Sequence, residues 1–444
     1  MRRSTGSYRS RAVVLAAVAA LGAGLLSGCA DDGDDKSDKS GGGGGGGGKT
    51  TITMGLFGTF GFQEAGLYDE YMKDHPDIKI EQTVIERNEN YYPQLLNHLS
   101  TGSGLADVQG IEIANITEVG QTQAAKFVDL SKTESVKKEN WLDWKWQQGT
   151  TKDGKTIGLG TDIGPMAICY RKDLFKKAGL PSDREKVGQL WSGDWNKYLE
   201  AGEKYMKNAP GDTAFVDAAS GVYNAVISSS AERYYDKSGK AIYKESPAVK
   251  DAWGIATKAA TGHLTARLQQ FQKTWDQAFA NGKFASIACP PWMLGYIQEK
   301  AGDKAKDQWD VAAAPKPGNW GGSFLAVPEA GKHKEEAAKL VAWLTAPEQQ
   351  AKLFAKRGSW PSAVASYSLP DVSNAKHPYF DNAPIGQIFT QAAKGIPVQV
   401  LGPKDQIIAS NIADIGLLQV DQQGKSPEAG WKAATKSIDN ALDQ

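Results

Sequence analysis

The chain has 444 residues, of which 41% are hydrophobic and 23% are charged, values that are ordinary for a soluble globular protein. Its 51 basic and 51 acidic residues balance, which argues against a nucleic-acid-binding protein, because such proteins normally carry a basic excess. The length predicts two domains, or three, at the usual ~100–200 residues each.

Residues 1–28 have the pattern of a secretory signal peptide, in which a basic segment precedes an apolar one, Ala12 to Leu26. The apolar segment is too short to span a bilayer comfortably. It ends in Leu26-Ser27-Gly28-Cys29, which resembles a bacterial lipobox and implies cleavage before Cys29 and lipidation of its thiol. The alternative is an ordinary secretory signal with a chance cysteine. Residues 29–49 are polar and glycine-rich, and we expect a flexible tether there.

The first part of the mature chain alternates between strand and helix patterns. Strands are predicted over Thr51–Phe57, Ile78–Val84 and Asp107–Ile113, with helices over Gln63–His75 and Tyr91–Ser100. This alternation predicts a mostly parallel sheet with helices on its faces. Ligand sites in such sheets lie beyond the carboxyl ends of the strands, so one cleft is expected among the loops 58–64, 86–90 and 112–115.

Two apolar runs, Ile157–Leu159 and Met166–Tyr170, flank the polar, strand-breaking segment Thr161–Pro165. Such a hinge suits a chain that leaves one domain for another, although a loop between strands of one sheet fits the pattern equally well. Asp173 is predicted to be the N-cap residue of the next helix. Cys169 lies in the second run and Cys289 in another. We expect both to be buried free thiols, and a disulfide between them is the alternative.

A buried strand over Phe284–Cys289 runs into Pro290-Pro291-Trp292, where two prolines argue against a regular helix or a central strand. We therefore expect a second crossing between domains at this point. Further strands are predicted over Trp309–Ala314 and Ser323–Val327. Further helices are predicted over Gly193–Met206, Thr274–Ala280, Lys332–Leu344, Pro347–Phe354, Ile407–Val420 and Ala429–Leu442.

Seven sequence pieces follow one another along nearly the whole mature chain. They are Leu26–Cys29, Gly102–Val108, Asp162 with Ile168–Phe175, Phe279–Ile287 running into Pro291–Trp292, Gly321–Gly322, Arg357–Pro361 and Ser426–Trp431. Their order and spacing resemble the extracellular sugar-binding lipoproteins of bacterial ABC importers, the maltose-binding-like family. Within it, the first loop and Gly386–Phe389 look most like actinobacterial cellobiose- and cello-oligosaccharide-binding proteins.

The resemblance implies an α/β fold of the periplasmic-binding-protein type, with two lobes that are each a mostly parallel sheet flanked by helices. Hinge crossings are expected near 162, 290 and 346, which gives an N-lobe of 50–162 and 290–345 and a C-lobe of 163–289 and 346–444. The implied function is that of a lipid-anchored solute-binding component on the outer face of the cell membrane. It would be a monomer that binds cellobiose or cellotriose between the lobes and delivers it to permease subunits.

A neutral oligosaccharide offers apolar C–H faces and hydroxyl groups, so its site needs aromatic platforms and directional hydrogen-bonding groups. Trp292, Trp320 and Trp360 fit no helix-core periodicity and are the predicted platforms, although a loop tryptophan can equally fill an apolar gap. The predicted polar contacts are Glu64, Asn88, Glu112, Asp162, Arg357 and Gln387. Asp162 is the strongest of them, because a charged side chain beside a hinge glycine gains little from packing. Glu64 has the alternative role of capping its helix.

Three other functions are compatible with parts of the sequence. One is binding of another oligosaccharide, such as a maltodextrin or a xylo-oligosaccharide. Another is a secreted carbohydrate-active hydrolase, with paired carboxylates such as Glu112 and Asp162 as acid and nucleophile. The third is a structural or adhesive surface lipoprotein. The five histidines lack metal-ligand spacing and the sequence has no Gly-x-Ser-x-Gly turn, so no metal, cofactor or catalytic residue is expected.

Overall fold

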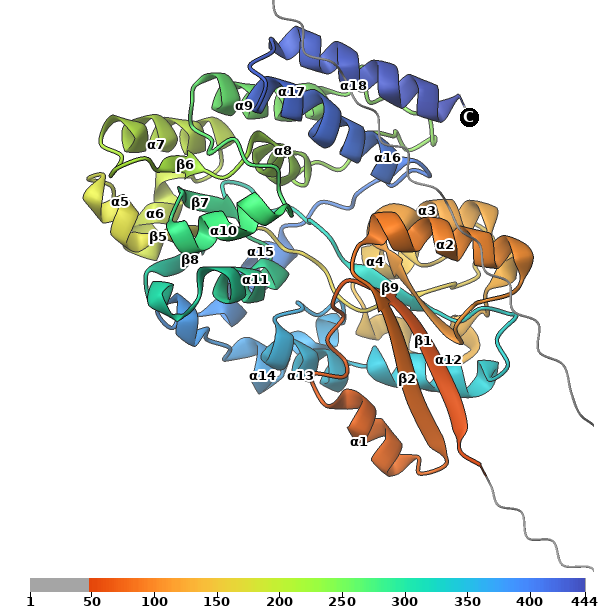
Figure 1. The fold of residues 1–444 in the computed structure, drawn as a ribbon. Coiled ribbons are helices and arrows are strands. Elements are labelled where there is room, and N and C mark those ends of the chain that lie inside the picture. The colour runs from red at the N-terminus through yellow and green to blue at the C-terminus, as the bar shows by residue number, and fades with distance from the viewer. Residues whose placement is uncertain (1–47, 444) are drawn as a thin grey trace, which may run out of the picture. The chain divides into compact units, whose positions relative to one another are not determined.

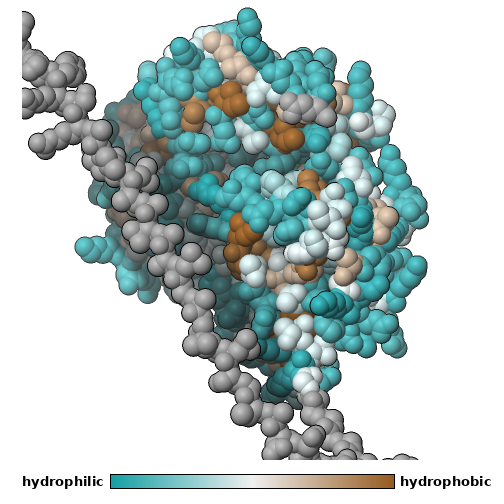
Figure 2. Space-filling model, turned by 45° about the vertical axis from the view of Figure 1, so that its right-hand side comes forward, coloured by the Kyte–Doolittle hydropathy of each residue, from teal (hydrophilic) through white to brown (hydrophobic). Residues whose placement is uncertain are grey.

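The computed structural model describes residues 48–443 (Figure 1). The predicted signal peptide, Cys29 and the predicted tether up to residue 47 lie outside these residues. Within the described part of the chain, no helix is both long enough and apolar enough to cross a membrane. Figure 2 shows one face of this part, on which hydrophobic residues form small separate patches among hydrophilic ones.

The first sheet has five strands in the order β2 (Ile78–Ile85), β1 (Thr50–Phe57), β3 (Val108–Glu112), β9 (Ser323–Ala326) and β4 (Leu159–Gly160). β1 pairs in parallel with β2 and β3, as the βαβαβ pattern predicts, while β9 is antiparallel to β3 and β4. Its helices are α1 (Leu67–Asp74), α2 (Asn88–Thr101), α3 (Ile113–Thr122), α4 (Asp143–Gln148) and α12 (Lys334–Leu344). We call this unit the five-stranded lobe.

The second sheet has four strands in the order β6 (Ala214–Val216), β7 (Phe284–Ala288), β5 (Ala167–Arg171) and β8 (Trp309–Ala313). Only β6 and β7 pair in parallel; β5 is antiparallel to both β7 and β8. The prediction of a mostly parallel sheet is therefore wrong for this lobe. β7 and β8 run in the same direction and are joined through a helix, and β5, which enters from the first crossing, lies between them antiparallel to both. We call this unit the four-stranded lobe.

The remaining helices come from three parts of the chain (Figure 1). The first group comprises α5 (Lys172–Lys177), α6 (Arg184–Trp191), α7 (Trp195–Lys207), α8 (Ala219–Ile227), α9 (Pro247–Thr261), α10 (Lys273–Asn281) and α11 (Pro291–Ala301). Next come α13 (Pro347–Arg357), α14 (Pro370–Ser373) and α15 (Ile385–Lys394), of which α15 packs on β5 and β8. The last are α16 (Asp405–Ser410), a π-helix over Asn411–Leu417, α17 (Leu418–Asp421) and α18 (Pro427–Leu442).

The chain passes between the lobes three times, and the three passages lie side by side. Thr161 and Ile163 of the first passage donate backbone hydrogen bonds to Ser323 (3.0 Å) and Trp360 (2.9 Å). The Gly164 N–H donates to Oδ1 of Asn319 at 2.8 Å. A Cβ atom on Gly164 would lie only 1.8 Å from the Trp320 carbonyl oxygen, so this approach requires glycine. The predicted hinge at 161–165 is thus a crossing and not a loop within one sheet.

The second and third passages differ from the predicted positions. Pro291 begins helix α11, where a missing N–H is tolerated, and the chain stays in the four-stranded lobe through β8. The second passage therefore lies between β8 and β9, at residues 314–322, and the N-lobe boundary predicted at 290 is wrong. The third passage follows α13, whose Leu353 packs in the core of the five-stranded lobe, so it falls beyond the predicted position near 346.

Two local predictions on β5 and α5 are corrected. Helix α5 begins at Lys172, and Asp173 lies in its first turn paired with Arg171 at 2.7 Å, so Asp173 is not the N-cap. The favoured free thiols are also corrected, because Cys169 and Cys289 form a disulfide with their Cα atoms 5.4 Å apart. The sequence indicates the burial of both residues but not the antiparallel pairing of β5 with β7 that brings them together.

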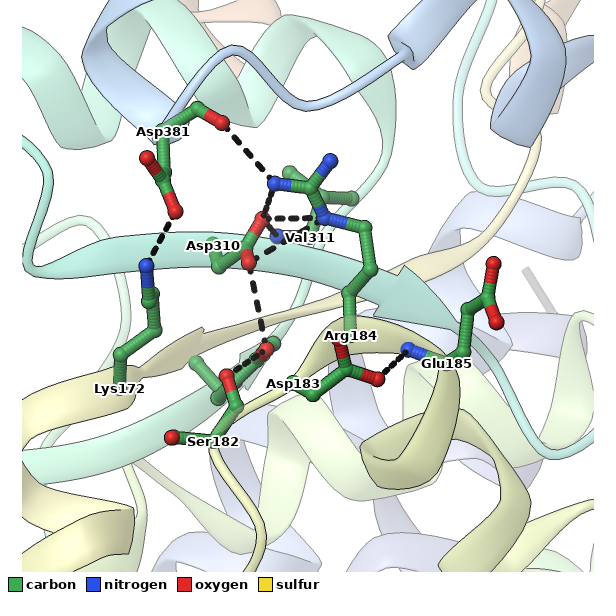
Figure 3. Close-up of polar contacts among 9 residues, drawn as sticks. Lys172, Ser182, Asp183, Arg184, Glu185, Asp310, Val311 and Asp381 are labelled. Atoms are coloured by element: carbon green, nitrogen blue, oxygen red, sulfur yellow. Dashed lines mark hydrogen bonds and ion pairs between the residues drawn. The ribbon is translucent and has the colours of Figure 1, made fainter.

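Ion pairs attach the chain after the third passage to the four-stranded lobe (Figure 3). Lys172 of α5 pairs with the carboxylate of Asp381, and Arg184 of α6 donates to the Asp381 carbonyl at 3.0 Å. The same guanidinium lies 3.0 Å from the buried carboxylate of Asp310 on β8. One arginine therefore connects the second sheet to the segment between α14 and α15.

Candidate functional site

A cavity of ≈ 80 Å³ lies where the carboxyl end of β1 meets the crossings. Its lining residues are Phe57, Gly58, Thr59, Phe60, Thr161, Asp162, Ser323, Leu353 and Ser359. The structure therefore brings the first predicted cleft loop and Asp162 together. Small-molecule sites usually measure roughly 300–1,000 Å³, so this cavity would hold only part of an oligosaccharide.

Asp162 lies half-buried in the first crossing. Its Oδ1 atom accepts hydrogen bonds from the Thr161 hydroxyl at 2.8 Å and from the Ser323 N–H at 2.9 Å. Its Oδ2 atom receives no hydrogen bond from the residues that the structure describes. The carboxylate is therefore fixed by one oxygen, and its second oxygen can accept a hydrogen bond from a ligand hydroxyl.

Glu112 ends β3 and lies opposite Ser323 in the sheet register. Ser323 is also the residue whose N–H binds Asp162. Its side chain accepts a hydrogen bond from the Ala114 N–H at 2.7 Å and so caps α3. Burial raises the pKa of Glu112 to about 7, and the Asp162 charge adds to this rise. The Ala114 N–H and the positive charges of Lys145 and Arg233 oppose it. At neutral pH this carboxyl group therefore exists in both protonation states.

Lys145 of α4 is a charged residue of this region that the sequence analysis missed. Its side chain is fully buried, and its Nζ atom has no hydrogen-bond partner among residues 48–443. The Nζ atom lies 3.8 Å from the centroid of the Phe324 ring. Burial lowers the pKa of Lys145 to about 8, against the opposing charges of Asp162 and Glu112. In the sequence, only the position of this lysine between Trp144 and Trp146 indicates that it is buried.

Arg233 approaches Glu112 from the other lobe and was also missed. Its Nη2 atom lies 3.1 Å from the buried carboxylate of Asp405, while its Nε atom is buried without a hydrogen-bond partner in the described chain. On the five-stranded side, Asn88 donates to Oδ1 of Asn115 at 2.8 Å, and its own Oδ1 is likewise buried and unpaired. Both atoms are therefore buried polar groups without a partner among the described residues.

Trp292 and Trp320 form an edge-to-face pair with ring centroids 5.5 Å apart and an interplanar angle of 80°. The indole N–H of Trp292 donates to the Trp320 carbonyl at 3.2 Å, and both residues are half-buried. The ring centroids of Phe271 and Trp292 lie 6.3 Å apart, and Phe271 is 37% exposed. Two of the three predicted platforms therefore lie in contact, and the Phe271 ring lies beside them. No sequence pattern had indicated Phe271.

The remaining predicted contacts differ in how far the structure exposes them. The Trp360 ring is fully buried against Phe354, Tyr367 and Phe389, so it has no free face for a sugar in this conformation. Arg357 packs its aliphatic part against Gly61, where a Cβ atom would lie 2.7 Å from its Cγ.

Glu64, in the turn before α1, and Gln387, on α15, are exposed. Neither side chain makes a hydrogen bond to the other predicted residues within the described chain. Neither residue lines the cavity with Asp162.

Comparison with known proteins gives one family. The family model described as bacterial extracellular solute-binding protein matches residues 66–380. The arabinooligosaccharide-binding protein of Bacillus subtilis (strain 168) is 26% identical over 362 residues, which cover 76% of this chain and 77% of that protein. The sn-glycerol-3-phosphate-binding periplasmic protein of Escherichia coli O6:K15:H31 (strain 536 / UPEC) is 23% identical over 403 residues, which cover 87% of this chain and 89% of that protein.

Solved structures extend the likeness to both lobes. One described as extracellular solute-binding protein family 1 is 40% identical, has a TM-score of 0.79, and covers 88% of this chain and 99% of its own. The ABC transporter associated binding protein from B. animalis subsp. lactis Bl-04, in complex with β-1,6-galactobiose, is 21% identical with a TM-score of 0.73. It covers 88% of this chain and 97% of its own. The shared fold therefore includes nearly all the described residues.

Proposed function

This chain belongs to the bacterial extracellular solute-binding proteins, as the solute-binding component of an ABC sugar importer, and we propose that its ligands are cello-oligosaccharides. Cellobiose or cellotriose would bind between the two lobes and pass to the permease. The relatives of this chain are binding proteins of ABC transporters and not enzymes, so the ligand is held and released unchanged.

The proposal is supported by the position of the Asp162 and Glu112 carboxylates beside the same crossings as the Trp292–Trp320 aromatic pair. Asp162 presents a free carboxylate oxygen next to Glu112, and Trp320 donates its backbone N–H to Gly164 of the same crossing at 2.9 Å. Stacking on an aromatic ring suits the apolar C–H face of a glucose unit, and hydroxyl groups donate to the carboxylates.

Two observations weigh on the alternatives. The phosphate ester named for the Escherichia coli relative would need a cationic partner, and neither the buried Lys145 nor the ion-paired Arg233 lines the cavity with Asp162. Arabino-, malto- and xylo-oligosaccharides offer the same hydroxyl and C–H chemistry as cellobiose. The likeness to an arabinooligosaccharide-binding protein makes an arabino-oligosaccharide the second candidate.

Isothermal titration calorimetry of the protein lacking residues 1–47 would test the proposal. The ligands are cellobiose, cellotriose, maltose, xylobiose, arabinobiose and sn-glycerol-3-phosphate. We expect cellobiose or cellotriose to bind at least about tenfold more tightly than the others, a difference of about 1.4 kcal/mol. Tighter binding of another sugar would reassign the ligand, and the absence of heat with every sugar would reject an oligosaccharide ligand.

The proposal includes anchoring of a monomer to the outer face of the membrane through a lipidated Cys29, supported by the Leu26–Cys29 motif. Mass spectrometry of the membrane fraction should find the diacylglycerol on Cys29. The variant Cys29→Ala should remain unlipidated, and light scattering of the soluble domain should give the monomer mass. An unmodified wild-type Cys29 would contradict the anchor, and a dimer mass would contradict the monomer.

A further inference from the structure

Lys145 occupies a closely fitted pocket in the five-stranded lobe beside the crossings. Two glycines leave the space for it. A Cβ atom on Gly160 would lie 2.8 Å from the Lys145 Cγ, and one on Gly322 would lie 3.0 Å from its Nζ. The Phe324 ring covers the ammonium group at 3.8 Å. A methyl group at either glycine would displace the lysine, so the backbone is shaped around this side chain.

Two further charged groups, Asp162 and Arg233, lie around Lys145 and Glu112. Asp162 of the first crossing and Glu112 of β3 act on Lys145, while Lys145, Asp162 and Arg233 act on Glu112. No carboxylate oxygen forms a hydrogen bond or an ion pair with the Lys145 Nζ within residues 48–443. The Lys145 Nζ atom lies beside Gly322 and Phe324, and Ser323 between them pairs with Glu112 and binds Asp162, so the lysine faces both acids without a hydrogen bond to either.

We propose that Lys145 is a positioning residue that favours the ionised form of Glu112, so that this carboxylate accepts a hydrogen bond from the ligand. This inference rests on the proposed function, because it assigns this carboxylate to a hydroxyl-bearing ligand. Lys145 does not contact the ligand, since its side chain is fully buried.

The energetics of burial distinguish a positioning role of Lys145 from a stabilising role. A buried ammonium group without a hydrogen-bond partner is unfavourable for folding, and apolar replacement of such groups often stabilises a protein. Lys145→Met has nearly the same length and should therefore unfold at the same temperature as the wild type or higher. It should nevertheless bind the ligand more weakly. A residue with a merely structural role would lose stability and affinity together.

The pH dependence follows from the two titrating groups. Burial raises the pKa of Glu112 to about 7, and Lys145 opposes that rise, so loss of the lysine charge raises this pKa further. Tenfold tighter proton binding by Glu112 would lower its ionised fraction at pH 7 from about one half to about one tenth, and the affinity for the ligand would fall about fivefold. Burial holds the pKa of Lys145 near 8, so the wild-type amine also loses its charge by about pH 9. The two affinities should converge there.

The test is calorimetry from pH 6 to pH 9 with the tightest-binding sugar of the panel, which itself does not titrate in this range. We expect Lys145→Met to bind about fivefold more weakly at pH 7, with the difference closing near pH 9. Lys352→Met, which removes a surface charge paired with Glu70, is the matched control and should follow the wild-type profile. A difference for Lys145→Met that does not depend on pH would overturn the inference.

A second readout needs no ligand. In protein labelled with carbon-13 in its glutamate carboxyl groups, the Glu112 signal is identified by its loss in Glu112→Gln. Its titration midpoint should lie higher in Lys145→Met than in the wild type, and an unchanged midpoint would overturn the inference. If the wild type binds no sugar, the proposed ligand class has failed, and this titration alone decides the role of Lys145.

Discussion

The ammonium group of Lys404 in the four-stranded lobe lies 3.0 Å from the carboxylate of Glu118 on α3 of the five-stranded lobe. A second contact crosses in the same way, because Arg87 donates a hydrogen bond to the backbone carbonyl of Phe271. Neither contact lies within the three crossings. Both can exist only while the lobes are close together, and so they favour a closed arrangement.

Loss of the Lys404–Glu118 pair should speed ligand release. The two side chains are 36% and 15% exposed, so we expect an effect of at most about 1 kcal/mol, or about a fivefold faster dissociation. Glu118→Gln is the preferred variant, because its amide oxygen can still accept the hydrogen bond from Tyr92, which measures 2.8 Å in the wild type. Stopped-flow tryptophan fluorescence with the bound sugar measures the rate.

A double-mutant cycle isolates this interaction from other effects of the substitutions. Lys404→Met and Glu118→Gln should be less than additive when combined, and the coupling should shrink at high salt. Lys352→Met provides the control, since Lys352 pairs with Glu70 at 2.5 Å with similar exposure. Additive effects on dissociation would show that the pair does not hold the lobes together.

Trp292 and Trp360 should respond differently to substitution. Trp292→Ala removes half of the edge-to-face pair with Trp320, and we expect ligand affinity to fall by ~1–3 kcal/mol, by analogy with base–aromatic stacking. Trp360→Phe changes a fully buried ring and should mainly lower the unfolding temperature. Calorimetry and thermal unfolding of both variants separate the two roles. Unchanged affinity in Trp292→Ala would remove this residue from the site.

Much of the fold was predictable because its strands are short apolar runs between turn residues. The predicted strand Thr51–Phe57 corresponds to β1 at Thr50–Phe57, and Ile78–Val84 to β2 at Ile78–Ile85. The crossing at Pro290 was predicted wrongly because a proline pair can break a helix or begin one, and only packing decides between them. The pairing of β8 with β5 depends on residues about 140 positions apart, which local patterns do not reveal.

Candidate site residues could be selected from the sequence where backbone signals coincide with polar residues. Asp162 was selected because it stands beside a flexible Gly-Pro pair, and Glu112 because it ends a strand. Lys145 and Arg233 were missed because their proximity to Glu112 arises only from the folded chain. Trp360 was misjudged for a related reason: it follows a glycine-containing loop, yet Phe354 and Phe389 enclose its ring from different helices.

The Cys169–Cys289 disulfide should contribute measurably to stability. It links residues 120 positions apart, and disulfides of this kind usually contribute about 2–4 kcal/mol. The double variant Cys169→Ala/Cys289→Ala should therefore unfold at a lower guanidinium concentration than the oxidised wild type. Thiol titration of the unfolded wild-type protein without Cys29 should find no free thiol. Two titratable thiols per chain would contradict the disulfide.

Substitution of Asp162 can distinguish ligand binding from support of the hinge. Asp162→Asn keeps an oxygen that accepts hydrogen bonds from Ser323 and Thr161, but it removes the charge. Asp162→Ala removes both. If the free carboxylate oxygen binds a ligand hydroxyl, both variants should lose about 1.5–3 kcal/mol of binding free energy, the usual contribution of a charged hydrogen bond.

The two variants should differ in stability, because only Asp162→Ala leaves the Ser323 N–H without its acceptor. We expect Asp162→Asn to unfold close to the wild-type temperature and Asp162→Ala to lose about 1–3 kcal/mol. Calorimetry and thermal unfolding of the same samples give both quantities. Wild-type affinity in Asp162→Asn, together with reduced stability in Asp162→Ala, would show that this carboxylate holds the crossings together and does not bind ligand.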